Sequence, residues 1–478
     1  MTIVWLILIL LVAFIAVIIA HALKFTPEQK ASVPAVDFPV DIESVTEHFQ
    51  QMIRLKTVSG MDESLVDQEE FIKFQNLLPT LYPTIYATCE YERIGLHGIL
   101  IRWAGKHSNE PSVFMAHYDV VPVNQAEWDE PAFEGLIKDG ELWGRGTLDT
   151  KGTLLGIMEA AESLLKQGFV PENDIYFAFG GDEETVSTDA PAIVDELERR
   201  GIKPALVLDE GGAIVEGVFP GVKQSAAVIG IAEKGSVYMD LSVQGAGGHA
   251  SAPPPQQAVA ILANALAKLQ RNAMPFALTK PAKELFDTMG RHSTFAYKII
   301  FANLWCFAPV INLICKMSGG ELNALVRTTC ALTKLSASDS YNVLPTSCKA
   351  GINLRIICGE TVESVTARLK AIIGDDRVTI KHVEGGGPSA ISRTIGDGWD
   401  RLTTAINQAY PEALVSPYLM VACSDSRHYC RISENVYRFS GMPLTKAQRG
   451  MIHNANERIP LNLLDDVVTF FACVMKQC

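Results

Sequence analysis

Imidazole and carboxylate side chains recur in this chain where apolar, strand-like runs end. His117 and Asp119 follow SVFMA, and Asp209 ends LVLD. A single polar residue at such a position is usually a turn former or a cap, but histidine nitrogen and carboxylate oxygen together are ligands that Zn²⁺ takes in proteins. Two imidazoles and several carboxylates at converging strand ends therefore predict a metal centre. The same set includes Asp149 in GTLDTKG, Glu183 and Glu184 in GGDEE, and His453 in MIHNANER.

Charge favours two metal ions at this centre. Carboxylates gathered in one crevice repel one another, and bound cations remove that repulsion. Three ligating carboxylates leave part of the charge of two Zn²⁺ ions uncompensated, which lowers the pKa of a water molecule between them. The adjacent side chains of Glu183 and Glu184 diverge along a regular backbone. One is expected to bind metal while the other acts as a general base toward the water.

Asp149 has two interpretations. It precedes the helix-like run TLLGIMEAAESLLKQ, where an aspartate can serve as the N-cap. Thr147 or Thr150 can cap the helix instead, which would leave Asp149 to bind metal. The small residues of GRGT before it allow the backbone to come close to such a site.

An alternation of strand-like and helix-like runs positions these side chains. Between residues 41 and 232, the strand-like runs are HGILIRWAG, SVFMAHYDVV, DIYFAFGG and PALVLDEGG. TLLGIMEAAESLLKQ and DAPAIVDELERRG have the apolar spacing of helices. This alternation predicts an α/β sandwich that binds its ligands at the strand ends. Residues 386–478 are expected to return to the same catalytic domain.

Residues 233–385 follow the order β-α-β-β-α-β, which is that of a ferredoxin-like unit. They are therefore expected to form a smaller domain inserted in the catalytic domain. A helical insertion at about 283–320 contains the apolar run FAYKIIFANLWCFAPVINLICKM. Polar residues and Pro309 interrupt this run, which favours a packed helical hairpin over a membrane span. A surface that contacts a partner or a membrane is the alternative.

The N-terminus is uncharged and apolar from residue 2 to residue 20. At ~1.5 Å per residue a helix of this length crosses the ~30 Å hydrocarbon layer. Residues 1–24 are therefore interpreted as a single-pass membrane anchor, with the catalytic body extracytoplasmic. A cleaved signal segment followed by secretion is the alternative, because Ala20-His21-Ala22 resembles a cleavage site. Residues 25–40, which are proline-spaced, are expected to form a linker.

The charge balance excludes one class of partner. The chain has 41 Lys+Arg against 54 Asp+Glu, a formal net charge of −13. Nucleic-acid binding proteins use a basic stripe to displace counterions from phosphates. We therefore expect no nucleic-acid partner.

The motif series HYDVVP, WGRGTLDTKG, GGDEE, LDEGG and IHNANER resembles that of the co-catalytic zinc aminoacylase and carboxypeptidase family. That family includes glutamate carboxypeptidase, aminoacylase and carnosinase. WDEPAFEG, ALVRTT, NVLPT and SDSRHY are similar to its branch of Gly-X carboxypeptidases and N-fatty-acyl-amino-acid hydrolases. The resemblance covers everything beyond the anchor and the linker. It implies the α/β/α sandwich of a dizinc peptidase with an inserted lid or dimerisation domain.

The resemblance also implies a role for each residue of the metal centre. Asp149 would bridge two Zn²⁺ ions, for which Co²⁺ or Mn²⁺ could substitute. Glu183 would be the general base, and Asp119 would orient the imidazole of His117. One ion would be held by His117 and Asp209, and the other by Glu184 and His453.

Four further residues are implicated through the same resemblance. His249 in GAGGHASAPP would reach a neighbouring active site and polarise the scissile carbonyl, in a homodimer formed through the inserted domain. Asn342 and Arg355 would grip the substrate carboxylate, and Arg427 is a second candidate, because a guanidinium pairs bidentately with a carboxylate. Residue type alone favours a turn residue at His249, and a surface ion pair is the alternative role for either arginine.

The expected function is zinc-dependent hydrolysis of the amide bond of a C-terminal amino acid with a free carboxylate. The substrate would be a Gly-X dipeptide or an N-acyl amino acid. An N-fatty-acyl amino acid synthase/hydrolase acting on lipids is the alternative within this class. A non-catalytic scaffold of the same fold is the alternative outside it, and the retention of every ligand and of the base argues against a scaffold.

Overall fold

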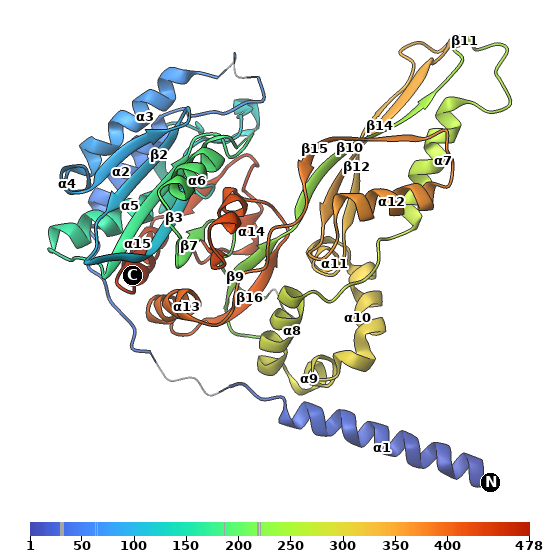
Figure 1. The fold of residues 1–478 in the computed structure, drawn as a ribbon, viewed down its shortest axis with the longest axis horizontal. Coiled ribbons are helices and arrows are strands. Elements are labelled where there is room, and N and C mark those ends of the chain that lie inside the picture. The colour runs from blue at the N-terminus through green and yellow to red at the C-terminus, as the bar shows by residue number, and fades with distance from the viewer. Residues whose placement is uncertain (29–32, 63, 65, 186, 218, 220) are drawn as a thin grey trace.

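The computed structural model describes residues 1–28, 33–62, 64, 66–185, 187–217, 219 and 221–478. It has a larger α/β domain, a smaller lid domain, and helix α1 (Thr2–Lys24) projecting beside the lid (Figure 1). Residues 29–32 of the predicted linker lie outside the described residues. This architecture confirms the predicted fold class.

Among the described residues, a nine-stranded sheet forms the centre of the catalytic domain. Its order is β1-β2-β6-β3-β7-β17-β9-β16, with β8 paired to β9. β3 runs parallel to both β6 and β7, so that the carboxyl ends of these three strands meet at one edge. The strands are β1 (Glu90–Ile94), β2 (Gly98–Trp103), β3 (His107–His117), β6 (Asn173–Gly180), β7 (Leu206–Asp209), β8 (Ile214–Val215), β9 (Ala226–Glu233), β16 (Leu414–Met420) and β17 (Val436–Arg438).

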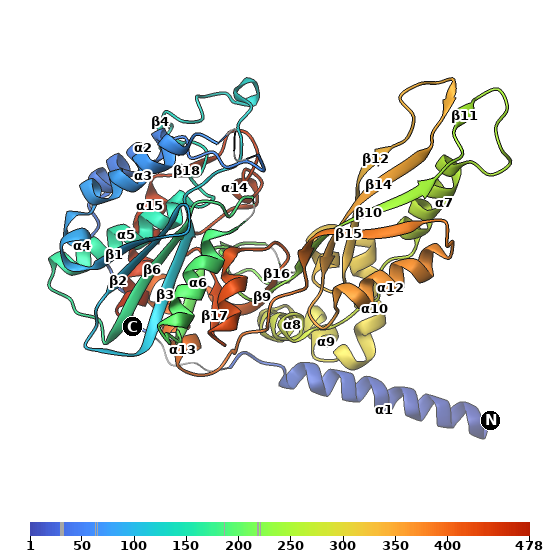
Figure 2. The ribbon, with the colours of Figure 1, turned by 45° about the horizontal axis from the view of Figure 1, so that its top comes forward.

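Helices cover both faces of this sheet (Figures 1 and 2). On one face α5 packs against α15, and Leu154, Ile157 and Phe471 are buried there because the apolar residues recur at helical spacing. On the other face α6 buries Ile193 and Leu197. The helices are α2 (Ile42–Arg54), α3 (Gln68–Leu81), α4 (Pro83–Thr88), α5 (Lys151–Lys166), α6 (Asp189–Arg199), α13 (Asp397–Ala409), α14 (Lys446–Arg449) and α15 (Asn462–Met475).

A small three-stranded sheet, in the order β18-β5-β4, joins two distant parts of the catalytic domain. It consists of β4 (Leu136–Lys138), β5 (Glu141–Trp143) and β18 (Arg458–Pro460). Because β5 precedes the loop of Asp149 and β18 follows the loop of His453, their pairing brings these two loops together. The short helices η2 (Gln125–Glu127) and η3 (Asp425–Arg431) complete the loops of this domain.

The lid has a four-stranded antiparallel sheet within the described part of the chain, in the order β12-β14-β10-β15. This is the strand order of a ferredoxin-like unit, as the sequence predicts. Two helices contribute Leu262 and Leu369 to its core, and β11 pairs with β13 at its far tip (Figure 1). The elements are β10 (Gly235–Gln244), β11 (Gly248–His249), α7 (Ala258–Arg271), β12 (Thr329–Ser336), β13 (Val343–Leu344), β14 (Ser347–Ile356), α12 (Val362–Ile373) and β15 (Thr379–Gly386).

The helical insertion of the lid lies at the end nearest α1 (Figure 1). Its helices are α8 (Lys280–His292), α9 (Phe295–Phe301), α10 (Leu304–Ser318) and α11 (Gly320–Ala324). α9 and α10 meet at 106°, so the apolar run forms a helical hairpin instead of one straight span. α8 packs against β16 of the catalytic sheet. The insertion therefore contacts both domains.

Candidate metal centre

The candidate ligands lie where the parallel strands end. His117 is the last residue of β3 and pairs in register with Gly180, the last residue of β6. Glu183 and Glu184 follow β6 within a few residues, and Asp209 ends β7. The parallel order of these strands thus gathers side chains that are far apart in the sequence.

Asp149 lies between the two predicted histidine ligands. Its Oδ1 is 3.1 Å from Nε2 of His117, and its Oδ2 is 3.0 Å from Nε2 of His453. Thr150, not Asp149, is the N-cap residue of α5, and no side-chain hydrogen bond caps this helix. The Asp149–Thr150 peptide is cis. The carboxylate is therefore directed at the imidazoles and not at the helix.

Glu184 completes the half of the cluster around His453. Its Oε2 is 3.1 Å from Nε2 of His453. Its other oxygen, Oε1, is buried and has no hydrogen-bond partner among the described residues. A buried carboxylate oxygen without a donor is costly, and a cation at this position would remove that cost.

Asp119 holds both His117 and the turn that carries the glutamates. Its Oδ1 is 3.2 Å from Nδ1 of His117, whose Nδ1 is also 3.0 Å from the Asp119 carbonyl oxygen. Its two carboxylate oxygens accept hydrogen bonds from the backbone N–H groups of Glu183 (3.2 Å) and Glu184 (3.1 Å). Nε2 of His117 is thus the nitrogen that faces the cluster, the arrangement expected of a metal-binding histidine.

Glu183 approaches the cluster without pairing closely. Its Oε2 lies 4.0 Å from Nε2 of His117. Burial raises the pKa of the Glu183 carboxyl well above its ordinary value, with Glu210, Asp425 and Glu184 adding to the increase and His117 opposing it. A carboxyl with a raised pKa, held beside the ligands, suits a residue that accepts and returns a proton.

The strand end after β7 offers two carboxylates, those of Asp209 and Glu210. The Asp209 carboxylate accepts a hydrogen bond of 3.0 Å from the backbone N–H of Ser426. The next residue, Glu210, instead places Oε1 3.6 Å from Nε2 of His117. His117, Glu183 and Glu210 each offer an atom that could hold one metal ion, and His117, Asp149 and Glu184 form a second such group. Glu210 was not among the predicted ligands, although its place in LDEGG beside Asp209 was a signal.

A buried ion pair holds the loop that carries Asp149. Glu457 is fully buried, and its carboxylate is 2.7 Å from Nη1 of Arg145. It also accepts hydrogen bonds from the backbone N–H groups of Gly146 (3.0 Å) and Leu148 (2.7 Å). Because Glu457 lies four residues after His453, it ties the loops of two candidate ligands together.

The charges of the cluster fit divalent cations. Hydrogen bonds to Asp149 and Glu184 raise the pKa of His453 to about 10. Burial acts to raise the pKa of Asp149, but hydrogen bonds from His117 and His453 act in the opposite direction, and the pKa is lowered. Burial raises the pKa of the remaining carboxyls. The site is rich in negative charge that bound cations would neutralise, and its carboxylates are Asp149, Glu183, Glu184, Asp209 and Glu210.

The cluster opens into a cavity of about 700 Å³ between the catalytic domain and the lid. Glu183, Glu184 and His453 line one side of it. The predicted substrate-binding residues Arg355, on β14 of the lid, and Arg427, on η3, line it as well. These two guanidiniums contact the Sγ of Cys423 (3.2 Å) and the carbonyl oxygen of Lys234 (3.3 Å), respectively.

His249 and Asn342 lie elsewhere. His249 is on β11 at the far tip of the lid, where its Nδ1 is 2.7 Å from the Oγ of Ser251. The carbonyl oxygen of Asn342 accepts a hydrogen bond of 3.0 Å from the N–H of Ala250. Figure 1 places this tip well away from the strand ends of the catalytic domain. Within one chain, the structure does not bring these two residues to the metal centre.

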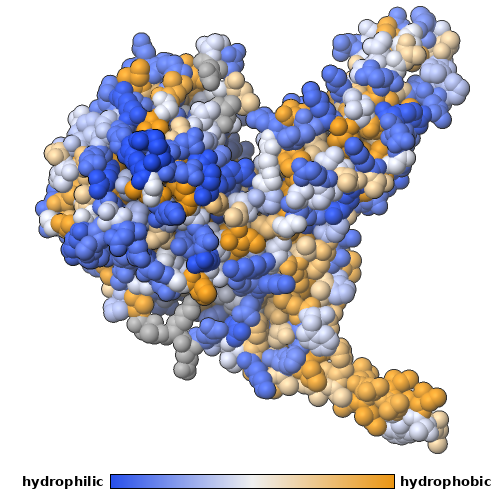
Figure 3. Space-filling view, viewed as in Figure 1, coloured by the Kyte–Doolittle hydropathy of each residue, from blue (hydrophilic) through white to orange (hydrophobic). Residues whose placement is uncertain are grey.

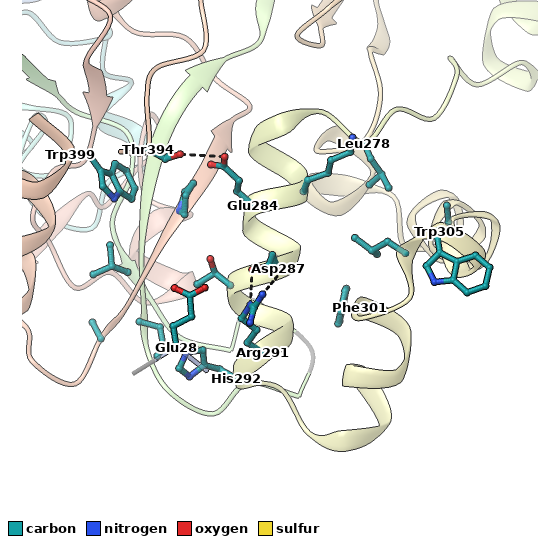
Figure 4. A pocket seen from close by; sticks show the side chains of 18 of the residues that line it. Glu28, Leu278, Glu284, Asp287, Arg291, His292, Phe301, Trp305, Thr394 and Trp399 are labelled. Atoms are coloured by element: carbon teal, nitrogen blue, oxygen red, sulfur yellow. Dashed lines mark hydrogen bonds and ion pairs between the residues drawn. The ribbon is translucent and has the colours of Figure 1, made fainter. Parts of the chain in front are cut away.

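A second cavity, of about 1150 Å³, lies between the helical insertion and the catalytic domain. Figure 4 shows Glu284 of α8 directed at Thr394, and Asp287 and Arg291 paired further along the same helix. Asp287 pairs with Arg291 at 2.7 Å, and Thr394 donates a hydrogen bond of 3.2 Å to Glu284. These polar groups of the second cavity are paired with one another. The groups of residues that could hold a metal ion include residues that line the first cavity.

Comparison with known proteins agrees with this geometry. The model of "Peptidase family M20/M25/M40" matches residues 113–477. "Probable carboxypeptidase S-like 2" of Dictyostelium discoideum is 33% identical over 98% of this chain and 92% of its own length. The human "N-fatty-acyl-amino acid synthase/hydrolase PM20D1" is 31% identical over 89% of this chain and 86% of its own length.

Solved structures share the fold. The metallo-carboxypeptidase Sso-CP2 of Sulfolobus solfataricus has a TM-score of 0.65 at 16% identity, covering 90% of this chain and 98% of its own. Human carnosine dipeptidase 1 has a TM-score of 0.61 at 14% identity, covering 92% and 99%. The matched segment contains all the candidate ligands and most of the sequence, and the chain therefore belongs to peptidase family M20/M25/M40.

Proposed function

We propose that this chain is a dizinc hydrolase that releases a C-terminal amino acid by cleaving the amide bond on its nitrogen. The observation that carries the proposal is the position of Asp149 between the Nε2 atoms of His117 and His453. The same cavity presents Arg355 and Arg427, which provide positive charge for a free carboxylate.

The geometry supports a definite set of ligands. Asp149 would be shared by two ions, of which Glu184 and His453 would hold one and His117 the other. For the third ligand of the second ion, the approach of Glu210 to His117 favours Glu210 over Asp209. Zn²⁺ suits this set of imidazole and carboxylate groups, and Co²⁺ or Mn²⁺ can occupy the same ligands.

The residues around the ions perform the proton transfers. When bound, the two ions supply a water molecule of lowered pKa and polarise the scissile carbonyl. Glu183 takes a proton from the attacking water and delivers it to the leaving nitrogen. Asp119 acts through others: it orients His117 and, through two backbone N–H groups, the turn that carries Glu183.

The two arginines set the requirement for a free carboxylate. A carboxylate held by a guanidinium through paired hydrogen bonds is fixed in orientation as well as in position. Arg355 belongs to the lid and Arg427 to the catalytic domain. A substrate bound by both would therefore span the two domains and hold the lid toward the metal centre.

The acyl side of the substrate distinguishes two candidates. Relatives are named as carboxypeptidases and as N-fatty-acyl-amino acid synthase/hydrolases, so either a Gly-X dipeptide or an N-fatty-acyl amino acid fits. The apolar N-terminal helix and the apolar insertion favour the lipophilic acyl group. Formation of the amide by the reverse reaction is then expected at high concentrations of fatty acid and amino acid.

A substrate panel tests this function. The detergent-solubilised full chain, loaded with Zn²⁺, is incubated with glycyl-leucine and with N-oleoyl-leucine, and leucine release is measured by mass spectrometry with and without a chelator. We expect chelator-sensitive release, faster from N-oleoyl-leucine. Esterification of the leucine carboxylate should abolish most of this leucine release. Equal rates on acid and ester would contradict the role of the arginines, and no release from either substrate would contradict the proposed function.

His249 and Asn342 are proposed to act on the metal centre of a partner. Both lie at the exposed tip of the lid, and neither approaches the centre of its own chain. A homodimer through the lid would allow the tip of one chain to reach the cavity of the other, where the imidazole of His249 could donate to the developing oxyanion.

The N-terminal helix is proposed to anchor the enzyme. α1 is 23 residues long, and among the described residues it is the one continuous helix that is apolar and long enough to cross a bilayer. A catalytic body outside the cytoplasm is the orientation that we propose. Comparison of the N-terminus of the mature protein with the encoded sequence tests the anchor against a cleaved signal segment.

A further inference from the structure

The hairpin of α9 and α10 has an exposed apolar surface. The residues Trp305, Leu313 and Met317 are 62%, 58% and 80% exposed. The hairpin segment 295–318 contains no acidic residue, and its charged residues are Lys298 and Lys316. In a chain of formal net charge −13, such a surface is unusual. A large exposed apolar patch on a protein marks a surface that binds a partner or a membrane.

The hairpin is attached to α1 by specific contacts. Nδ2 of Asn303 donates a hydrogen bond of 3.0 Å to the carbonyl oxygen of Ile18, and Oδ1 of Asn303 is 2.9 Å from Nδ1 of His21. The rings of Phe14 and Trp305 meet edge to face with centroids 5.9 Å apart. The second half of α1 thus packs along the hairpin. Figure 3 shows apolar surface continuing from α1 over α9 and α10.

These contacts determine how deep the hairpin would lie if α1 crosses a membrane. Phe14 is ten residues before Lys24, the last residue of α1, a distance of ~15 Å along the helix axis. One leaflet contributes about 15 Å of the ~30 Å hydrocarbon core. A residue that contacts Phe14 from the side therefore lies below the surface of the bilayer, and Trp305 is such a residue.

The break between the two helices is compatible with this environment. Non-helical backbone is tolerated at membrane depth only where its polar groups are satisfied. Asn303, at the break, bonds to groups on both sides: its Nδ2 also donates a hydrogen bond of 2.9 Å to the carbonyl oxygen of Ile299, and its Oδ1 accepts one of 3.3 Å from the indole Nε1 of Trp305. The buried Asn303 side chain thereby joins α1, α9 and α10 into one unit.

We propose that the α9–α10 hairpin of the lid is embedded in one leaflet of the bilayer beside α1. The protein would then contact the membrane through two elements, α1 and this hairpin. The proposal rests on α1 crossing the membrane. The continuity of the apolar surface of α10 with α1 favours lipid as the occupant, since any other partner would have to occupy the same leaflet. The positive charges of Lys298 and Lys316 suit an anionic headgroup region.

One consequence concerns the orientation of the lid. A helix that spans the bilayer alone leaves the attached body free to turn about a linker. A hairpin embedded beside it fixes the lid relative to the membrane and holds the second cavity, which Phe301, Leu304 and Trp305 line, next to the acyl chains.

Photolabelling tests the proposal on the full chain. The protein is reconstituted into vesicles of phosphatidylcholine and phosphatidylserine that contain a phosphatidylcholine with a diazirine in its acyl chain, and labelled peptides are mapped by mass spectrometry after irradiation. We expect label in α1 and in residues 304–318. The tip of the lid supplies the internal control. Leu335, near the end of β12, and Tyr341, just before β13, are also highly exposed. β13 pairs with β11, which lies at the end of the lid far from α1 (Figure 1).

A matched pair of variants sharpens the test. Leu313→Glu combined with Met317→Glu should reduce label in 304–318 at least about fivefold, because a carboxylate is costly in hydrocarbon, and should leave the label in α1 unchanged. Leu335→Glu, an equivalent change at the tip of the lid, should leave the label in α1 and in residues 304–318 unchanged. Label in α1 but no more in 304–318 than at the tip would overturn the inference and retain the anchor. Label in neither α1 nor residues 304–318 would overturn both the anchor and the embedded hairpin. Cross-links between the hairpins of two chains, without lipid label, would overturn the inference and assign the surface to a second copy of the chain.

Discussion

At the scale of single residues, the decisive feature is the difference in environment between two adjacent glutamates. Glu184 pairs with His453 at 3.1 Å, whereas Glu183 remains 4.0 Å from His117. Burial raises the pKa of both carboxyls, so the difference lies in their contacts. One side chain therefore suits a metal ligand and the other a proton carrier, as the divergence of neighbouring side chains predicts.

Replacing the base should separate turnover from metal binding. Glu183→Gln keeps the shape of the side chain but cannot accept the proton, so kcat should fall by about 10²–10⁴ while the protein retains two equivalents of zinc. Elemental analysis and amide-hydrolysis kinetics measure the two quantities. Glu363→Gln on the exposed start of α12 is the control, and full activity of Glu183→Gln would contradict the mechanism.

The choice between Asp209 and Glu210 can be made by metal content. Glu210 approaches His117, while Asp209 accepts a hydrogen bond from Ser426. Glu210→Gln should therefore lower bound zinc from two equivalents toward one in equilibrium dialysis. Asp209→Asn should retain both. Loss of one ion from Asp209→Asn but not from Glu210→Gln would show that Asp209, as the sequence resemblance implies, is the ligand.

At the scale of elements, the loops of Asp149 and His453 depend on one buried ion pair. Glu457 and Arg145 lie 2.7 Å apart, with side chains 0% and 4% exposed. Glu457→Ala would leave a buried guanidinium and several N–H groups without their acceptor. The free energy of unfolding should fall by about 3–5 kcal/mol, measured by urea denaturation, and zinc affinity should fall with it because Asp149 loses its support.

An exposed ion pair provides the comparison for that variant. Arg393 and Glu434 pair through side chains that are 61% and 72% exposed. Glu434→Ala should change the unfolding free energy by less than about 1 kcal/mol, because water screens such pairs. Similar effects of the two substitutions would show that Glu457 contributes nothing beyond an ordinary surface contact.

The elements that carry these residues could be predicted to a large extent from sequence. Apolar runs that end in His117, Gly180 and Asp209 indicate strands, and the parallel pairing of β3 with β6 and β7 follows from the helices between them. The hydrogen bond that Asp209 accepts could not be predicted, because the fold brings its donor, the N–H of Ser426, from a distant segment. The same holds for Glu457, whose partner Arg145 lies on another loop.

At the scale of the whole molecule, the metal centre and the lid tip of one chain are separated. The cluster lies at the strand ends of the catalytic domain, and β11 lies at the opposite end of the lid (Figures 1 and 2). If His249 takes part in the reaction, a second chain must supply it. Membrane attachment through α1 would raise the local concentration of chains and favour such pairing.

Mixing two inactive variants tests whether the site is shared between chains. In a dimer of His249→Ala with Glu183→Gln, the first chain keeps Glu183 and would receive His249 from its partner, so that one of the two sites is complete. Random mixing makes about half of the dimers mixed, and activity should therefore return to roughly a quarter of the wild-type value. Each variant alone, prepared at the same concentration, should remain inactive. No recovery in a mixture shown by cross-linking to contain mixed dimers would mean that His249 does not act across the interface.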